Sequence, residues 1–482
     1  MHGFDMLVSV SVVTVITCFS QFNCQEAYTS TDTGEEFYAH SSNYLDSWPG
    51  YEVNHEDSPT ANVPIIVWWT DGGNLNPHYL SDSGPSYAHL TCPNKASCYS
   101  TVDMSPRIMN DERTRGILFY GTDLDPLDLP LPRLKHHEWA LIHEESPLNN
   151  YVLAHDAVMR LFNHTSTFRR ESHYPLSTQA IEEEDYLIRR QPVSIAKKNE
   201  ARKSGGLASV VYVQSHCDVP SDRDTYVEEL MKYIDIDSFG TCLHNKDLPE
   251  HLHEPAENFL HEDFLEILSN YKFNLAFENA YCNDYMTEKI MRPLHVGVVP
   301  VYKGSPVVQD WMPNNHSVIL VDNFGSPKEL ADYIKYLDEN DTEYETFLEF
   351  KKKGIENKFL FDHLHNREWS EGTKDYFRGF ECYLCKQLND RVEAEKAHEQ
   401  DPSLPLLPPQ MANNSHLGCP VPERMDIGSG ISKTWPSIDW TALYWSGVDS
   451  ARAVQRMMEA GESDSQKFTK YRKEEINRHL KG

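Results

Sequence analysis

Short apolar runs alternate with helix-like segments over residues 209–340. We predict strands at 209–214, 273–277, 298–302 and 318–321, and helices at 221–234, 262–271, 287–295 and 327–340. The last helix has Ser326 as its expected cap, with Pro327 next and Glu329 three residues on. Strands that alternate with amphipathic helices predict a doubly wound parallel sheet, which binds ligands at the carboxyl ends of its strands, beside helix N-termini.

The preceding part of the chain has the same alternation with less regularity. Strand-like runs lie at 64–69, 116–120 and 138–142, each ended by turn residues, and 151–162 has a helical pattern. A polar stretch over 186–206 ends in Ser204-Gly205-Gly206, which favours a domain boundary. We therefore predict two α/β domains that face a cleft, at 61–203 and 204–388.

Two flanking regions differ from this core. The acidic, turn-rich residues 25–60 are typical of a stem, and 389–482 form a C-terminal extension. The extension begins with a charged helix to residue 400, continues as a Pro-rich linker over 401–422 and ends in a basic amphipathic helix over 467–481. Its aromatic residues are expected to dock on the protein body rather than to bind sugar: Trp435, Trp440, Tyr444 and Trp445.

The first 24 residues hold an apolar stretch, Met6 to Phe19, with small residues Cys18 and Ser20 near its end. This pattern favours a cleaved secretory signal, and an uncleaved anchor or a buried strand stays open. Four Asn-x-Ser/Thr sequons agree with a lumenal chain: Asn163, Asn315, Asn340 and Asn413. We expect the secretory-pathway lumen, in the Golgi or endoplasmic reticulum, with type II membrane topology if the segment is not cleaved.

Eight cysteines follow the leader: Cys92, Cys98, Cys217, Cys242, Cys282, Cys382, Cys385 and Cys419. They allow roughly a hundred pairings, so connectivity does not follow from the sequence. Close spacing makes Cys92–Cys98 and Cys382–Cys385 the simplest disulfides. The second pair could also be redox-active or, with His363 and His365, hold zinc.

Composition bounds the function. The 482 residues are 39% hydrophobic and 24% charged, which fits a globular chain of two or three domains. The 44 basic and 74 acidic residues give a net charge of −30, which argues against a nucleic-acid partner. An anionic ligand would have to be met by a few local cations.

Two cations lie where such a ligand is expected. Arg223 falls in the first turn of a helix expected to be capped by Ser221, and Lys289 falls in the first turn of one capped by Thr287. The helix dipole disfavours a cation there by about 0.3–1 kcal/mol, so a shared anion such as a diphosphate is one explanation. Pairing with neighbouring Glu or Asp is the other.

Motifs over residues 60–390 resemble the alpha-(1,3)-fucosyltransferase family. They are, in order, Glu145-Ser-Pro147, Leu161 to Thr165, Thr167 to Glu171, Tyr271 to Asn279, Asp284 to Lys289, Val298 to Gly304 and Val321 to Lys328. The segment Glu144 to Asn150 and the long tail resemble the divergent animal branch numbered ten and eleven, which includes protein O-fucosyltransferases.

The resemblance implies a GT-B-like fold, GDP-fucose as donor and inversion at the fucose anomeric carbon. It implies that the domain at 61–203 binds the acceptor and that the domain at 204–388 binds GDP-fucose. Matched residue by residue, Glu145 is the general base, Arg223 and Lys289 contact the pyrophosphate, Asn279 and Tyr285 belong to the donor site, and Glu288 lies near fucose. The base assignment could slip to Glu144, and Asn274 departs from the aromatic residue of several relatives.

The resemblance implies no required metal, although two Asp-x-Asp pairs, at 123–125 and 235–237, leave Mn²⁺ open as a stimulant. We interpret both pairs as loops. The acceptor is either GlcNAc of a glycoprotein glycan or Ser/Thr of a folded protein domain. An inactive relative that binds glycoproteins or assists their quality control is the alternative, and the intact set of site residues argues against it.

Overall fold

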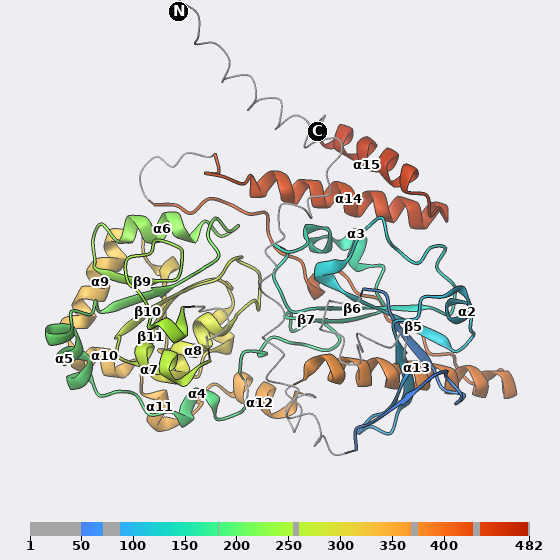
Figure 1. Ribbon diagram of the computed structural model, residues 1–482, viewed down its shortest axis with the longest axis horizontal. Coiled ribbons are helices and arrows are strands. Elements are labelled where there is room, and N and C mark those ends of the chain that lie inside the picture. The colour runs from blue at the N-terminus through green and yellow to red at the C-terminus, as the bar shows by residue number, and fades with distance from the viewer. Residues whose placement is uncertain are drawn as a thin grey trace, which may run out of the picture.

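The computed structural model describes residues 50–70, 87–181, 183–253, 260–367, 375–427 and 434–480. The predicted leader and most of the predicted stem lie outside these ranges. Two α/β halves lie side by side, each with its own sheet (Figure 1). Among the helices of the described residues, none is both long and apolar enough to cross a lipid bilayer.

The first half is built on a seven-stranded mixed sheet in the order β1-β3-β4-β2-β5-β6-β7. Its strands are β1 (Glu52–Glu56), β2 (Ile65–Trp68), β3 (Tyr87–Thr91), β4 (Ser97–Thr101), β5 (Thr114–Tyr120), β6 (Glu138–His143) and β7 (His164–Thr167). Strand β3 runs antiparallel to β1 and β4, and the other pairs are parallel. The last residues of the predicted stem therefore form an edge strand of this sheet.

Short helices connect these strands: α2 (Pro106–Met109), η3 (Gly121–Asp123), η4 (Tyr151–Ala154) and α3 (Asp156–Met159). The helix predicted at 151–162 is thus two short pieces, interrupted at His155, whose backbone is extended. The side chain of Asn150 caps the first piece.

The second half holds a five-stranded parallel sheet in the order β12-β11-β10-β8-β9. Its strands are β8 (Val210–Val213), β9 (Ile236–Phe239), β10 (Phe273–Phe277), β11 (Val299–Lys303) and β12 (Ile319–Leu320). Its helices are α4 (Tyr186–Arg189), α5 (Ile195–Gly205), α6 (Arg223–Leu230), η5 (Glu250–Leu252), α7 (Glu262–Ser269), α8 (Glu288–Val296), η6 (Val308–Trp311), η7 (Val321–Asn323), α9 (Pro327–Glu339), α10 (Asp341–Thr346), α11 (Phe350–Lys353) and α12 (Lys358–Asn366). The predicted alternation of strands and helices is confirmed.

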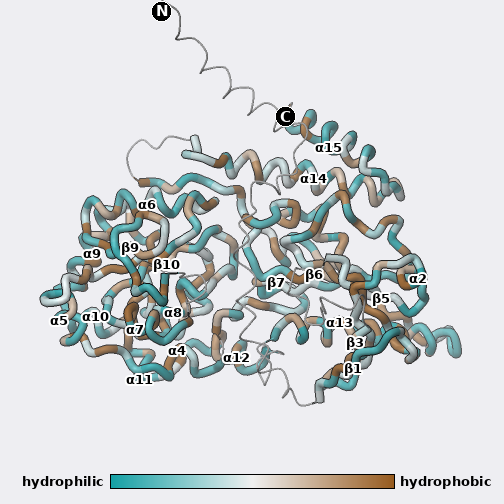
Figure 2. The backbone as a smooth tube through the Cα atoms, in the orientation of Figure 1, coloured by the Kyte–Doolittle hydropathy of each residue, from teal (hydrophilic) through white to brown (hydrophobic). Residues whose placement is uncertain are grey.

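Apolar residues gather on the strands and the inner faces of the helices, as Figure 2 shows by hydropathy. A large core in the second half joins β8, β10 and β11 to helices α4, α6, α8 and α9. The first sheet has a core on each face. Burying apolar area in this way supplies the main favourable term in folding, at about 25 cal/mol per Å².

The chain then returns to the first half. Helix α13 (Tyr376–Gln400) follows α12 in sequence but packs against β4, β5 and β6 (Figure 1). Buried Glu381 on this helix accepts hydrogen bonds from the side chains of Trp68 (2.7 Å) and Ser100 (2.6 Å). The predicted boundary at 388/389 is therefore wrong, because it divides a helix that belongs to the first half.

The other predicted boundary, at 203/204, is also misplaced. It falls inside α5, and Lys198 of that helix donates hydrogen bonds to Tyr271 O and Gly297 O of the second half (both 2.8 Å). Tyr186 and Leu187 already lie in the core of the second half. The polar character of 186–206 marks surface helices that cover the second sheet, so the division between the halves lies before Tyr186.

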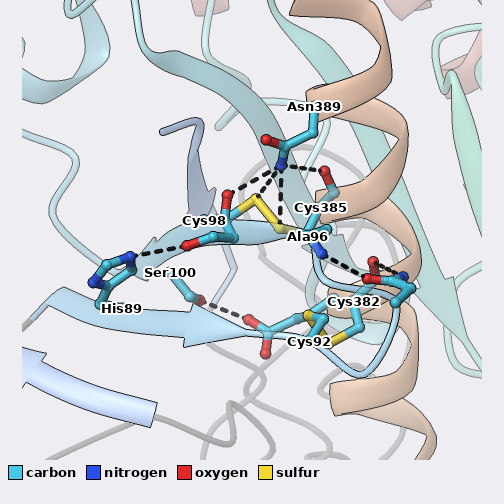
Figure 3. The surroundings of a disulfide bond; sticks show 11 residues. His89, Cys92, Ala96, Cys98, Ser100, Cys382, Cys385 and Asn389 are labelled. Atoms are coloured by element: carbon cyan, nitrogen blue, oxygen red, sulfur yellow. Dashed lines mark hydrogen bonds between the residues drawn. A yellow bond between two sulfur atoms is a disulfide. The ribbon is translucent and has the colours of Figure 1, made fainter. Parts of the chain in front are cut away.

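Two disulfides fix α13 to the β3–β4 hairpin (Figure 3). They join Cys92 to Cys382 and Cys98 to Cys385, so the predicted pairs Cys92–Cys98 and Cys382–Cys385 are wrong. In the hairpin the residue opposite Cys98 is Leu90, not Cys92. Cys382 and Cys385 lie one turn apart on α13 and therefore face the same strands.

Asn389 stands beside the second of these disulfides (Figure 3). Its amide nitrogen donates hydrogen bonds to Ser97 O (3.0 Å) and Cys385 O (2.9 Å) and contacts both sulfur atoms. Two further disulfides, Cys217–Cys242 and Cys282–Cys419, complete the pairing of the eight cysteines. Because Cys382 and Cys385 are bonded elsewhere, neither the redox pair nor the zinc site with His363 and His365 is present.

The C-terminal extension continues over both halves. It contains η8 (Asn414–His416), α14 (Trp440–Ala460) and α15 (Ser465–His479), and the basic helix predicted at its end is confirmed. The segment predicted as a Pro-rich linker is docked: Ala412 N donates to Phe162 O (2.9 Å), and Cys419 is disulfide-bonded. Trp440 is buried, as expected for a docked aromatic residue, whereas Trp445 is 36% exposed.

Candidate active site

Glu145 follows directly from the carboxyl end of β6 and contacts the other half of the protein. The hydroxyl of Tyr285 donates a hydrogen bond to Glu145 Oε2 over 3.1 Å. Tyr285 is buried, and its ring packs edge-on against Phe168 with centroids 5.1 Å apart. Glu145 and Tyr285, which belong to separate sequence motifs, therefore meet where the two halves contact each other.

The surroundings of Glu145 make its carboxylate a stronger base. Burial raises its pKa above the usual value for glutamate, and Glu288 acts in the same direction. Lys289 and the hydrogen bonds from Tyr285 and the Ser146 backbone partly oppose that rise. A carboxylate with a raised pKa beside a second acidic group and a lysine is an arrangement suited to general acid–base chemistry.

The neighbouring Glu144 has a different environment. It is 7% exposed, and its Oε1 accepts a hydrogen bond from the Tyr120 hydroxyl over 3.0 Å. Its backbone carbonyl accepts a hydrogen bond from the side chain of Gln179 (3.3 Å). These two hydrogen bonds connect Glu144 to Tyr120 and Gln179, whereas the hydrogen bond from Tyr285 goes to Glu145.

Helix α8 begins beside Glu145 with the predicted cap, Thr287, whose hydroxyl accepts from the Lys289 backbone N–H. Glu278 holds this cap from the end of β10: its two carboxylate oxygens accept from the backbone N–H and the hydroxyl of Thr287, both at 2.8 Å. Glu278 is fully buried. It lies within a motif of the sequence analysis but was given no role there.

Lys289 lies among acidic groups. Its Nζ is 3.0 Å from Glu288 Oε1, 3.8 Å from Glu278 Oε2 and 3.1 Å from the Thr287 hydroxyl. Burial would raise the pKa of Glu288, but Lys289 and Arg292 together lower it to about 2. Of the two explanations for a cation in this first turn, the structure shows pairing with neighbouring acids for Lys289.

Arg223 is the first residue of α6, after Asp222 rather than the predicted cap Ser221. It is 1% exposed, and its terminal nitrogens donate to Phe277 O (2.9 Å) and His216 O (2.7 Å). Its Nε is buried with no hydrogen-bond partner in the described residues. One N–H on each terminal nitrogen and the N–H of Nε thus remain without a hydrogen-bond partner among the described residues.

Hydrogen bonds join Ser221, in the loop after β8, to Glu278 and Asn279 at the end of β10. The backbone N–H of Ser221 donates to Asn279 O (3.0 Å), and the Ser221 hydroxyl donates to Glu278 O (2.7 Å). The side-chain oxygen of Asn279 is buried without a hydrogen-bond partner among the described residues. Such an orphaned acceptor is expected to find its donor in a ligand or in water.

The environment of His216 indicates that Arg223 and Lys289 lie in one region of the protein. Burial lowers its pKa, and Arg223 and Lys289 each lower it further. Its imidazole therefore lies within electrostatic range of both cations. His216 could not be predicted as a site residue, because a lone histidine in a loop has no distinctive pattern.

A buried ion pair fixes the second half to the first beside this region. Asp284, which is 1% exposed, accepts hydrogen bonds on Oδ1 from Arg170 Nε (2.9 Å), Arg170 Nη2 (2.6 Å) and Trp311 Nε1 (2.9 Å). Arg170 follows β7 of the first half, and Asp284 directly precedes Tyr285. This contact positions Tyr285 against Glu145.

Neither Asp-x-Asp pair belongs to a group of three metal ligands in the described residues. Asp125 accepts from the backbone of Leu127 (2.8 Å), and Asp237 accepts from the Tyr271 hydroxyl and Lys246. Two groups of three candidate ligands do occur there. Cys217, Asp224 and Cys242 include a disulfide, and the exposed group His251, His261 and Asp263 comes from η5 and the start of α7.

The predicted glycosylation sites differ in accessibility. Asn163 is buried, with its amide nitrogen donating to Gln410 O (2.9 Å) and its oxygen accepting from Trp139 N (3.0 Å), so its assignment is contradicted. Asn315 and Asn413 are exposed. Asn340 is partly exposed and caps α10.

Comparison with known proteins adds independent findings. A family model described as glycosyltransferase family 10 (fucosyltransferase) C-term matches residues 203–401, and one described as fucosyltransferase, N-terminal matches residues 61–177. The chain is 48% identical over 373 residues to a protein from Xenopus laevis named GDP-fucose protein O-fucosyltransferase 3, covering 75% of this chain and 74% of the relative. Relatives with the same name from Gallus gallus and Bos taurus are 43% and 45% identical, covering 85% and 77% of this chain and 83% and 75% of their own lengths.

Solved structures are more distant. A crystal structure of an alpha1,3-fucosyltransferase with GDP is 17% identical, with a TM-score of 0.37, and covers 64% of this chain and 91% of that chain. A crystal structure of an alpha1,3-fucosyltransferase with GDP-fucose is also 17% identical, with a TM-score of 0.35, and covers 61% and 85%.

Proposed function

The chain belongs to glycosyltransferase family 10, the fucosyltransferases, and from that membership we propose that it transfers L-fucose from GDP-fucose to a hydroxyl group of a protein. The relatives that it matches over three quarters of its length are named as protein O-fucosyltransferases. Of the two acceptors expected from the sequence, their names favour Ser/Thr of a folded protein domain over GlcNAc of a glycan.

The observation that carries the proposal is the contact between Glu145 and Tyr285. It places a carboxylate of raised pKa from the first half next to the Lys289 and Glu288 of the second. A transferase needs a base for the incoming hydroxyl and a cation for the departing phosphate within one site. These groups supply both.

In the proposed reaction the acceptor oxygen forms a bond to the fucose anomeric carbon while the bond from that carbon to the diphosphate breaks. Glu145 takes the proton of the acceptor hydroxyl. The electron pair of the broken bond leaves on the β-phosphate of GDP, whose negative charge is met by Lys289, Arg223 and the N-terminus of α8. Attack opposite to the leaving group inverts the anomeric carbon.

The remaining site residues have supporting roles in this proposal. Tyr285 orients Glu145, and the low pKa of Glu288 keeps a negative charge available near the fucose ring, where positive charge develops as the bond breaks. Asn279 offers its unpartnered side-chain oxygen to a hydroxyl of the donor. Because Lys289 already pairs with Glu288, donor binding has to redistribute these contacts rather than create them.

We propose that charge on the diphosphate is met by these side chains, with no metal required and Mn²⁺ at most a stimulant. Besides GDP-fucose, the partners are folded protein domains. The four disulfides are typical of an oxidising compartment, and we propose the lumen of the Golgi or endoplasmic reticulum. Contact with a membrane would be made only through residues 1–24, if they stay attached.

Incubation with labelled GDP-fucose tests the proposal. One reaction contains a disulfide-bonded protein domain with surface Ser and Thr, a second contains a GlcNAc-terminated glycan, and Glu145→Gln is the matched control in both. We expect mass spectrometry to find fucose on the protein hydroxyl. Transfer to the glycan alone would contradict the acceptor, and GDP binding without transfer to either would favour the inactive relative.

A further inference from the structure

The loop between β8 and α6, residues 215–222, leads directly into Arg223 and has an unusual backbone. Asp218 and Asp222 have φ angles of +53° and +52°. A left-handed backbone costs a residue other than glycine roughly 1–2 kcal/mol, somewhat less for Asp, so other contacts must hold these two positions. His216, whose carbonyl accepts from Arg223, lies in the same loop.

The C-terminal extension holds the second of these positions. Asp222 is 6% exposed, and its Oδ2 accepts from Arg424 Nε (2.6 Å) and from the Met425 backbone N–H (3.0 Å). Thr225 donates to the other oxygen (2.7 Å) and receives a hydrogen bond from Arg424 Nη2 (3.2 Å). Both carboxylate oxygens of Asp222 thus accept hydrogen bonds, one from Thr225 of α6 and the other from Arg424 and Met425 of the extension.

The extension also holds the first position. The indole Nε1 of Trp440 donates to the carbonyl of Asp218 over 2.9 Å. Trp440 is 3% exposed and begins α14. Both left-handed residues of the loop are therefore contacted by one segment more than 200 residues away in sequence.

A covalent bond places the same segment against the other side of the site. Cys419 is disulfide-bonded to Cys282, which lies between Asn279 and Tyr285. Beyond Trp440, α14 packs on the first half: Ala451 and Val454 lie in its core, and the Cα of Gly447 passes so close to Tyr151 that a Cβ there would meet it at 2.7 Å. Figure 1 shows the extension running from the second half across to the first.

We infer that residues 419–427 and 434–440 form a strap that holds loop 215–222 in the conformation that binds the donor, with Arg424 and Trp440 as positioning residues. The strap acts on the backbone around Arg223 rather than on its guanidinium, whose hydrogen bonds go to Phe277 O and His216 O. The inference rests on the proposed function, because the ligand of the loop is the diphosphate of GDP-fucose. It gives the extension a part in donor binding.

The experiment compares two variants in the full chain. Arg424→Gln removes the charge that matches Asp222, and Trp440→Phe keeps an aromatic ring while removing the donor to Asp218. Arg456→Gln is the control, since Arg456 is in the same extension but, among the described residues, contacts Glu474, Glu475 and the Tyr471 ring of α15. Calorimetry with GDP, the KM values for GDP-fucose and acceptor, and hydrogen exchange of loop 215–222 are measured for each.

If the loop is in its binding conformation only about a tenth of the time without Arg424, the Kd for GDP rises about 10-fold. We expect Arg424→Gln to show that rise, with a higher KM for GDP-fucose, an unchanged KM for the acceptor and faster exchange in the loop. Trp440→Phe should show a smaller effect of the same kind. Arg424→Lys, which keeps the charge, should recover part of the affinity.

Wild-type GDP affinity and exchange in Arg424→Gln and Trp440→Phe would overturn the strap. So would an equal loss in Arg456→Gln, because the effect would then come from the general stability of the extension. Failure of the wild-type chain to bind GDP would contradict the proposed function instead. The exchange measurement needs no GDP and would still decide whether the strap holds the loop.

Discussion

Tyr285 reaches from one half of the protein to donate a hydrogen bond to Glu145 of the other, over 3.1 Å. Tyr285 is itself fixed, since its carbonyl accepts from the Tyr302 hydroxyl (3.3 Å) and its neighbour Asp284 is paired with Arg170. The proposed base is therefore oriented by a residue of the donor half. Alignment of the base with the donor depends on how the two halves meet.

Glu145→Gln tests the base. Glutamine still accepts the hydrogen bond from Tyr285 but cannot take a proton at neutral pH, so transfer should fall by about 10²–10⁴-fold. GDP affinity and the thermal midpoint should change little, because the proposed diphosphate site lies in the other half. Glu144→Gln is the matched control and should retain most activity, since its partner Tyr120 can still donate to the amide oxygen. An inactive Glu144→Gln variant together with an active Glu145→Gln variant would show that Glu144 is the general base.

Tyr285→Phe tests the coupling through pH. The Tyr285 hydrogen bond lowers the pKa of Glu145, so its loss raises that pKa further. A base must be deprotonated to act; the rise in turnover from acid pH should therefore move to higher pH in the variant. The pH profile of kcat measures this shift. A profile that stays in place or moves to lower pH would show that another group sets it.

Lys289→Ala tests the diphosphate site. Loss of one cation that meets the leaving charge should reduce use of GDP-fucose by about 10²–10³-fold. GDP carries the same diphosphate, and its affinity by calorimetry should also fall. Lys232→Ala is the control, because Lys232 is exposed and pairs with Glu229 on the outer side of α6. Equal GDP affinity in the two variants would remove Lys289 from the site.

Removal of metal ions tests whether the side chains suffice. Turnover in EDTA should remain substantial if Arg223 and Lys289 meet the charge of the diphosphate. If EDTA abolished turnover and Mn²⁺ restored it, the side chains would not suffice, and Asp123 and Asp125 would become the candidate metal ligands. Asp123→Asn and Asp125→Asn would then be expected to mimic EDTA.

The paired disulfides on α13 predict an effect that is not additive. With Cys98–Cys385 intact, Cys92–Cys382 closes a ring of only about nine residues, and its loss costs about 2.5 kcal/mol in the chain-entropy model. With Cys217–Cys242 and Cys282–Cys419 intact, loss of the remaining bond opens a loop of about 190 residues and costs about 5.3 kcal/mol. Denaturant unfolding of the two single and the combined Cys→Ser pairs measures this. If the local pairs Cys92–Cys98 and Cys382–Cys385 formed instead, each variant would break both disulfides, and the combined variant would lose no more stability than either one. Non-reducing peptide mapping would also detect those local pairs.

Local patterns were enough to predict the second half. Strand β10 has the predicted bounds, and α7, α8 and α9 differ by a few residues at most, because their apolar spacing and caps lie within each element. Strand β9 was missed: its four residues include Asp237 and Ser238, which interrupt the apolar pattern. The edge strand β1 and its neighbour β3 were missed for a similar reason, since pairing rather than composition defines them.

Features that depend on distant parts of the chain were not predictable. The partner of Cys98 is 287 residues away, and Asn163 is buried by a tail segment 247 residues away. At the site, the residue types came from motifs and resemblance, whereas the cap-holding role of Glu278 and the contacts of Arg223 with backbone carbonyls needed coordinates. A sequence motif therefore predicts which residue types form the site, whereas their hydrogen-bond partners depend on the tertiary structure.

The return of α13 to the first sheet has a consequence for synthesis. Ribosomes add about 5–20 residues per second, so some 15–60 seconds pass between the emergence of Cys92 and that of Cys382, 290 residues later. Throughout that interval the nearest thiol to Cys92 is Cys98, and one face of the first sheet has no helix to cover it. We therefore expect newly made chains to need chaperones and disulfide isomerases until residue 400 has left the ribosome.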